Sequence, residues 1–374
     1  MKIKLLVILI IPFFTQAQWI DSSCSKKAKP VVELAIEYGL NLEQQMAIGA
    51  ANAALKIDEN CGCAKLVLAA MSSGRSWGTR SKKLDQIAYA ELSKEEQAWY
   101  TLLKASNEDY DKTASMIKSK FPKSPLLQFL AIKPQTWDAY PGFVEQFPEY
   151  ASAAYNMMSY GYMGEGYGDS NFEQAMAMTD KSLSLHEGPN ILDSKAEHFA
   201  ANGNYEKALE YQLKAVDFGS FVSPYWESAT LYWRNMNADT IKVSLKEKMK
   251  TSQNAILERD IEEFKKYIHS KFEMITGDSN LKEFYSFTDE QFEVEPVITW
   301  ESFDLYNMDV ALTPDIKTAV LTFYAKGSYF LNEKPEEKVP YSTRASSVWI
   351  ASDEGWKMIH ANWAPFNDGI GIPK

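Results

Sequence analysis

The chain has 374 residues and a mass of 42.4 kDa, which exceeds the usual size of one domain and predicts two or three. Hydrophobic residues make up 45% and charged residues 24% of the sequence, a composition that excludes a disordered polymer, a collagen and a coiled-coil rod. The net charge of -11 opposes contact with a phosphate backbone, so we expect no nucleic-acid partner.

Residues 1–17 have the features of a secretory signal peptide. Lys2 and Lys4 precede an apolar run that ends at Phe14, and Thr15 and Ala17 are the small residues that signal peptidase reads. The run is too short to cross a bilayer, and no later segment approaches the necessary length. We therefore predict an exported protein, periplasmic or secreted, with no membrane span.

The cysteines and histidines form no pattern typical of a metal site. An exported chain can form disulfides, and the spacing allows Cys24 to bridge either Cys61 or Cys63. The four histidines are scattered, with no two at ligand spacing: His186, His198, His269 and His360. The sequence predicts no metal site and no cofactor.

The segment from Pro189 to Phe218 has the pattern of two antiparallel helices separated by a glycine turn at Asn202-Gly203-Asn204. Apolar or small side chains share one face of each helix: Leu192, Ala196 and Phe199 in the first, and Ala208 and Ala215 in the second. One unit upstream, Asn171-Phe172-Glu173-Gln174-Ala175 mirrors Asn204-Tyr205-Glu206-Lys207-Ala208 at a separation of 33 residues. This unit resembles the tetratricopeptide repeat, whose period is about 34 residues.

Earlier residues continue the pattern in a more degenerate form. Ser93 and Glu96 predict a capping box at the start of a helix, and Ala114 and Ile117 mark the helix that follows it. The resemblance implies that residues 18–244 form an all-α tetratricopeptide-like superhelix with a concave groove. Such a groove implies a protein or peptide partner.

The pattern changes after about Asp239. One amphipathic helix is predicted over residues 245–269, and segments of period two, rich in β-branched and aromatic residues, follow from Val297. The predicted strands include residues 318–325, 343–351 and 356–363, and the loop from Ser352 to Gly355 joins the last two as a hairpin. Helices followed by strands predict an α+β domain over residues 245–374.

The last hairpin is the basis of a second resemblance. Ser347-Val348-Trp349, an acidic-Gly turn and the segment from Trp356 to Pro365 resemble the final hairpin of nuclear transport factor two-like domains. Members include SnoaL-like polyketide cyclases, ketosteroid isomerase and the association domain of the calmodulin-dependent kinase. The resemblance implies a cone, in which a curved antiparallel sheet wraps around helices and leaves a pocket at its wide end. It also implies a homodimer through the outer face of the sheet, the alternative being that these strands pack on the repeat stack.

Strand alternation then predicts the lining of the cone. Trp356, Met358, His360 and Asn362 share one face of the last strand. If Ala351 pairs with Trp356, Trp349 faces Met358 and Ser347 faces His360. The candidate pocket residues are therefore Ser347, Trp349, Met358, His360 and Asn362.

Two functions are compatible with this sequence. The first is an exported, non-catalytic binding or scaffold protein, whose repeats bind a polypeptide and whose cone mediates assembly or holds a small apolar ligand. The second is an enzyme of the isomerase, cyclase or dehydratase type with His360 as general acid or base. The sequence offers no carboxylate partner for His360, and a histidine hydrogen-bonded within a core is the alternative role for this residue. We therefore favour the binding protein.

Overall fold

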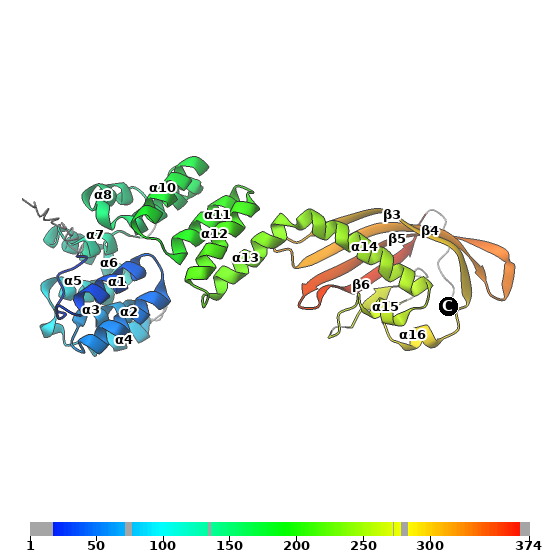
Figure 1. Ribbon diagram of the computed structural model, residues 1–374, viewed down its shortest axis with the longest axis horizontal. Coiled ribbons are helices and arrows are strands. Elements are labelled where there is room, and N and C mark those ends of the chain that lie inside the picture. Colours follow the sequence, from blue (N-terminus) through cyan, green and yellow to red (C-terminus); the bar gives the residue numbers. More distant parts are fainter. Residues whose placement is uncertain (1–17, 72–76, 134–135, 272, 278–282, 367–374) are drawn as a thin grey trace, which may run out of the picture. The chain divides into compact units, whose positions relative to one another are not determined.

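The computed structural model describes residues 18–71, 77–133, 136–271, 273–277 and 283–366 (Figure 1). The predicted signal peptide lies outside these residues. Contacts divide the chain into two compact units, Met1–Ala229 and Thr230–Lys374. The first unit is helical and the second contains a mixed sheet, in the predicted order. None of the described helices has the length and apolar character needed to cross a membrane.

The first unit, which we call the helical unit, consists of α-helices linked by short turns. Three of the turns are themselves helical: η1 (Tyr89–Glu91), η2 (Pro148–Tyr150) and η3 (Gly161–Glu165). The α-helices are α1 (Lys29–Leu40), α2 (Gln44–Ile57), α3 (Gly62–Met71), α4 (Trp77–Leu84), α5 (Lys94–Lys104), α6 (Asn107–Lys120), α7 (Pro125–Leu130), α8 (Ala139–Gln146), α9 (Ser152–Tyr160), α10 (Phe172–Leu185), α11 (Pro189–Ala201), α12 (Tyr205–Phe218) and α13 (Ser223–Met236), whose last residues belong to the second unit.

Neighbouring helices of this unit pack in pairs, as the helical periodicity predicts. The pairs α9–α10 and α11–α12 make extensive contacts, and the alanines at their crossings are fully buried, including Ala175, Ala196 and Ala208. Gly203 adopts the left-handed backbone conformation that the predicted turn requires, with a φ of 77°. The Asn204 side chain then caps α12 by accepting a hydrogen bond from the backbone N–H of Lys207.

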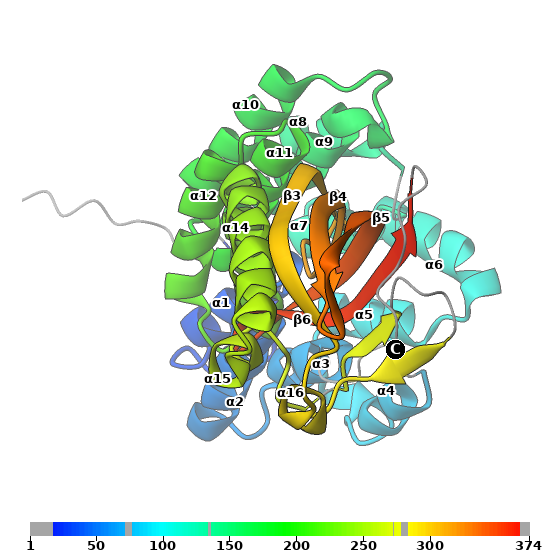
Figure 2. The ribbon, with the colours of Figure 1, turned by 90° about the vertical axis from the view of Figure 1, so that its right-hand side faces the viewer.

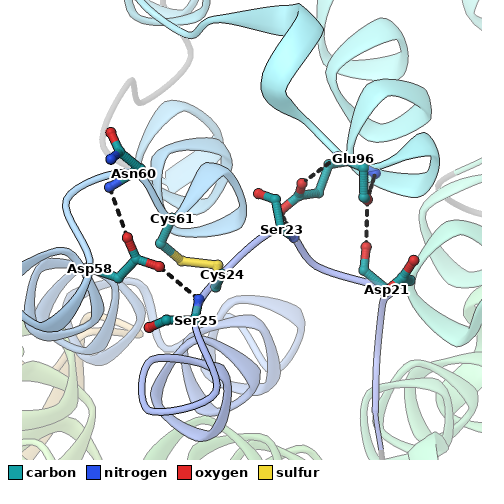
Figure 3. Close-up of a disulfide and its surroundings, with 9 residues drawn as sticks. Asp21, Ser23, Cys24, Ser25, Asp58, Asn60, Cys61 and Glu96 are labelled. Carbon is teal, nitrogen blue, oxygen red and sulfur yellow. Dashed lines mark hydrogen bonds between the residues drawn. A yellow bond between two sulfur atoms is a disulfide. The ribbon is translucent and has the colours of Figure 1, made fainter.

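A disulfide and a capping box fix the start of the helical unit. Cys24 is bonded to Cys61, which resolves the two predicted pairings, and Cys63 is a buried free thiol whose pKa is raised by burial. Beside the disulfide, Asp58 accepts hydrogen bonds from the backbone N–H groups of Ser25 and Asn60 (Figure 3). The predicted capping box is present, because the Ser93 hydroxyl and the Glu96 carboxylate each accept a backbone N–H of the other residue.

The second unit, which we call the cone unit, begins before the predicted boundary. Its first complete helix starts at Ala238, and Ile241 and Leu245 of this helix pack into the same core as the sheet, so the predicted boundary at residue 244 falls inside a helix. The elements are α14 (Ala238–Leu257), α15 (Ile261–Lys265), β1 (Ile275–Gly277), β2 (Phe284–Ser286), α16 (Glu290–Glu293), β3 (Ile298–Leu312), β4 (Thr318–Leu331), β5 (Lys334–Ser352) and β6 (Gly355–Pro365).

The sheet has the strand order β2-β1-β6-β5-β4-β3. Long strands β3 to β6 form an antiparallel meander, and α14 lies alongside them on one face (Figure 2). The three predicted strands and the predicted hairpin are confirmed. The expectation of an antiparallel sheet is wrong at one position, because β1 pairs with β6 in parallel.

The predicted helix over residues 245–269 is interrupted in the structure. Arg259 has a φ of 58°, in the left-handed region, and this conformation ends α14. The side chain of Asp260 then caps α15 by accepting the backbone N–H of Glu263. The break turns Phe264 into the core of the cone unit, where it is 1% exposed.

Candidate functional site

The cone unit contains a cavity of about 570 Å³ between α14 and the inner face of the sheet. Elements from the whole unit contribute to its lining: α14, α15, β1, β2, α16, β3, β5 and β6. Because these segments span more than one hundred residues of sequence, only the folded unit assembles the cavity. Its volume is in the range of small-molecule sites in proteins.

Eight of the nineteen residues that line the cavity are aromatic. Phe264 packs against Phe287 and Phe292, with ring centroids 5.0 and 5.9 Å apart. A second group of rings comes from the sheet, and in it Trp300 meets Tyr341 edge to face with centroids 5.0 Å apart. Such surfaces favour apolar or aromatic ligands, because burial of apolar area stabilises the complex.

Five polar or charged side chains also line the cavity: Ser252, Gln253, Arg259, Thr276 and Gln291. One of them lacks a partner. The Gln253 side chain of α14 is 7% exposed, and no donor within the described residues reaches its Oε1 atom. The Arg259 guanidinium also lines the cavity, but it donates hydrogen bonds to the backbone carbonyls of Phe292 and Val294. A ligand that donates one hydrogen bond to Gln253 would satisfy the unpaired acceptor.

Of the five predicted pocket residues, Met358 lines the cavity. Trp349 and Ser347 are on the same face of the sheet but are fully buried beneath α14. The Trp349 indole N–H donates to the Ser347 hydroxyl at 2.9 Å, and that hydroxyl donates in turn to the Met249 sulfur at 3.7 Å. Both are therefore core residues with satisfied polar groups.

His360 and Asn362 are on the opposite face, which corrects the predicted lining. Trp349 pairs with Met358 as predicted, but Val348, not Ser347, pairs with His360, because Ile359 forms a β-bulge. Because side chains alternate between the two faces of a strand, the extra residue places each following side chain of β6 on the face opposite to the predicted one. Ala361 and Trp363 face the cavity instead.

The segment that precedes β1 contacts β6 beside the bulge. The backbone N–H of Met358 donates to the carbonyl of Tyr267 at 2.7 Å, and Ile268 forms an isolated parallel bridge to Met358. His360 then pairs with Ile275 of β1, and its Nδ1–H donates to the Ile275 carbonyl at 2.9 Å. The imidazole is therefore engaged with an edge strand, away from the cavity.

Most of the residues that line the cavity were not predicted from the sequence. Tyr341 was predictable, because alternation along β5 places it on the same face of the sheet as Ser347 and Trp349. The positions of Gln253 and Arg259 in the lining were not predictable from strand alternation, since both depend on the course of α14 and on where it ends.

A group of potential metal ligands forms near the β5–β6 turn, although none was predicted. Ligand atoms of His269, Asp353 and Glu354 lie within 4.8 Å of one another. The His269 Nδ1 atom accepts the backbone N–H of Lys271 at 3.1 Å, so the neutral ring carries its proton on Nε2. A ligating imidazole instead donates through its free nitrogen. This arrangement fits hydrogen bonding better than metal coordination.

No family model matches the chain, and no curated protein matches it. Among solved structures, it is similar to an NTF2-like protein from Cytophaga hutchinsonii, with 14% identity and a TM-score of 0.28; the match covers 33% of this chain and 96% of that one. It is also similar to the association domain of C. elegans CaMKII, with 14% identity and a TM-score of 0.28, over 35% of this chain and 98% of that one. The likeness is to NTF2-like structures over about a third of the chain.

Proposed function

We propose that this protein is an exported, non-catalytic binding protein whose cone unit holds a small apolar ligand. The observation that carries the proposal is the aromatic cavity of about 570 Å³ with one unpaired buried acceptor, on Gln253. This combination of a large apolar surface and few oriented polar groups is typical of ligand sites. We also propose that the cone unit belongs to the nuclear transport factor two-like fold.

The lining supports binding over catalysis. No Asp, Glu, His, Lys or Cys side chain is among the described residues that line the cavity, and its titratable groups are those of Arg259, Tyr285 and Tyr341. The alternative, an isomerase, cyclase or dehydratase with His360 as general acid or base, requires that imidazole to reach a bound substrate. His360 instead donates to the Ile275 carbonyl on the other face of the sheet.

We propose that the helical unit is a tetratricopeptide-like stack that binds a protein or peptide. The paired helices with buried alanines at their crossings and the 33-residue separation of Ala175 and Ala208 support this assignment. Export is supported by the Cys24–Cys61 disulfide, because disulfides persist in oxidising compartments.

We further propose that the cone unit forms a homodimer through the outer face of its sheet. Val320, Val348 and His360 form one row across that face, and Tyr306 stacks on Tyr324 with ring centroids 5.6 Å apart. Light scattering on the purified protein is expected to give twice the mass of one chain, and the mass of a single chain would contradict the dimer.

Binding to the cone is tested with N-phenyl-1-naphthylamine, an uncharged apolar fluorophore that carries one N–H donor. We expect one molecule to bind per chain, with enhanced fluorescence. Ala361→Phe places a ring inside the cavity and is expected to weaken binding at least about tenfold. The matched control is Ala364→Phe, because Ala364 is on the same strand but pairs with the exposed Arg344 on the other face.

The role of Gln253 is tested with the same probe. Gln253→Met keeps the side-chain length and removes the acceptor, and we expect affinity to fall by about tenfold, the loss of one hydrogen bond in a buried site. Equal binding by the native protein, Ala361→Phe and Ala364→Phe would refute the proposed site.

A further inference from the structure

A second, smaller cavity of about 200 Å³ lies in the helical unit. It is formed by the segment before α1, by α1 itself, by the η2 turn and by the end of α10. Its lining residues are Trp19, Pro30, Glu33, Leu34, Glu37, Asn41, Glu149, Tyr150, Ser152 and Leu185. No part of the cone unit contributes to it, so it is a site of its own.

The charge of this cavity is negative. Glu33, Glu37 and Glu149 line it, and no Lys or Arg is among the described lining residues. Glu37 already interacts with His186, whose Nδ1 lies 2.8 Å from its Oε1 atom. Lys29 is close enough to Glu33 to lower its pKa, although this effect is smaller than that of burial. Within the described residues, neither Glu33 nor Glu149 forms an ion pair with a Lys or Arg side chain, although Lys29 lies near Glu33.

Glu33 is the residue that points to a ligand. Its side chain lines the cavity although the residue is only 9% exposed. Its Oε2 atom accepts the backbone N–H of Trp19 at 2.6 Å, whereas Oε1 has no partner within the described residues. Burial raises the pKa of this carboxyl to about 7, against smaller lowering effects of the backbone N–H groups of Trp19 and Ile20 and of the charge of Lys29. A buried carboxylate oxygen without a donor is costly, and a cationic donor would remove that cost.

Apolar groups surround the carboxylates. The rings of Trp19 and Tyr150 meet edge to face with centroids 4.7 Å apart, and both line the cavity. Leu34 and Leu185 also line it and are 41% and 40% exposed, which places alkyl surface where the cavity meets solvent. Aromatic faces attract cations, and exposed leucines favour a methylene chain.

We propose that this cavity binds an alkylammonium group, with the cation donating to Glu33 and the alkyl chain passing between Leu34 and Leu185. A free amine and a lysine side chain of a polypeptide share this chemistry. The site goes beyond the function proposed for the cone and does not depend on it.

The test measures binding of n-butylammonium, Nα-acetyl-lysine amide and the uncharged Nα-acetyl-norleucine amide to the full-length protein by NMR titration. Both ammonium probes are expected to bind at least tenfold more tightly than the norleucine compound, and more weakly in high salt. Similar affinities for the two ammonium probes would show that a free amine is enough for binding and that no polypeptide backbone is needed. An affinity at least fivefold higher for the lysine compound would identify a polypeptide source.

Glu33→Gln keeps the side-chain shape and removes the charge, and it is expected to weaken ammonium binding at least tenfold. Glu108→Gln, at an exposed position of α6, is the matched control and is expected to change nothing. Equal binding of the ammonium and norleucine probes would overturn the proposal. Full ammonium affinity in a folded Glu33→Gln variant would also overturn it. The comparison of probes remains decisive if that variant does not fold.

Discussion

Replacing Cys24 and Cys61 together by serine is expected to lower the free energy of unfolding of the helical unit by about 3–4 kcal/mol. The disulfide joins residues 37 positions apart and ties the segment before α1 to the start of α3. Its removal frees the unfolded chain to adopt many more conformations. The same segment contains Trp19 and Ile20, which are 6% and 1% exposed and would lose their anchor in the core.

Urea unfolding followed by far-ultraviolet circular dichroism measures this effect. Cys63→Ala is the control, because it removes a buried free thiol without removing a cross-link. We expect the control to cost no more than about 1 kcal/mol. A double serine variant as stable as the control would show that the disulfide contributes little to the fold.

Raising the pH from 6.5 to 9.5 is expected to destabilise the helical unit by about 3 kcal/mol through His186. Burial alone would lower the pKa of this imidazole, but hydrogen bonds with Glu37 and Glu43 outweigh burial and raise it to about 9. The distances are 2.8 Å from Nδ1 to Glu37 and 3.0 Å from Nε2 to Glu43. The contact with Glu43 requires Gly188, since a Cβ atom there would collide with the Glu43 carboxylate.

The direction follows from proton linkage. Because the pKa of His186 is higher in the folded than in the unfolded state, its stabilising contribution is complete below pH 6.5 and is lost as the pH rises through 9. The raised pKa of Glu33, about 7, also reduces stability with rising pH, but mainly between pH 4.5 and 7. The pKa of the buried Cys63 thiol is also raised, so this thiol too reduces stability at the upper end of the range. The contribution of His186 is therefore measured as the difference between the native protein and a His186 variant over the same pH range.

Unfolding free energies of the native protein, His186→Gln and His198→Gln at pH 6.5 and 9.5 test this prediction. His198 is also buried in the helical unit, but burial lowers its pKa to about 4, so it stays neutral throughout this range. We expect the loss of stability between these pH values to be about 3 kcal/mol smaller in His186→Gln than in the native protein, and to be unchanged in His198→Gln. The same slope in all three proteins would refute the role of His186.

Local sequence signals predicted the elements of this fold well. The capping box of Ser93 and Glu96 depends on residues three positions apart, and the hairpin of β5 and β6 on a four-residue turn. Alternation also predicted that Trp349 faces Met358, because that pair lies between the turn and the bulge. In each case the deciding interaction is between neighbours in sequence.

Long-range contacts decided the features that the sequence did not predict. The Tyr267 carbonyl accepts a hydrogen bond from the backbone N–H of Met358, next to the bulge that places His360 on the outer face. Tyr267 and Met358 are far apart in sequence, so the alternation of residues within one strand does not reveal this contact. His186 likewise meets carboxylates 149 and 143 residues away. Of the five predicted residues of the cone site, Ser347, Trp349 and Met358 are therefore on the face that bounds the cavity, His360 and Asn362 are on the other face, and Met358 lines the cavity.

Methyl NMR of the methionines reports directly on whether an apolar ligand occupies the cavity of the cone unit. Met249, Met274 and Met358 line the cavity, whereas Met116 and Met236 are 55% and 45% exposed elsewhere. At saturating N-phenyl-1-naphthylamine we expect shifts at the three cavity methyl groups and none at the two exposed ones. Shifts confined to Met116 or Met236, with the cavity methyl groups unchanged, would contradict the account.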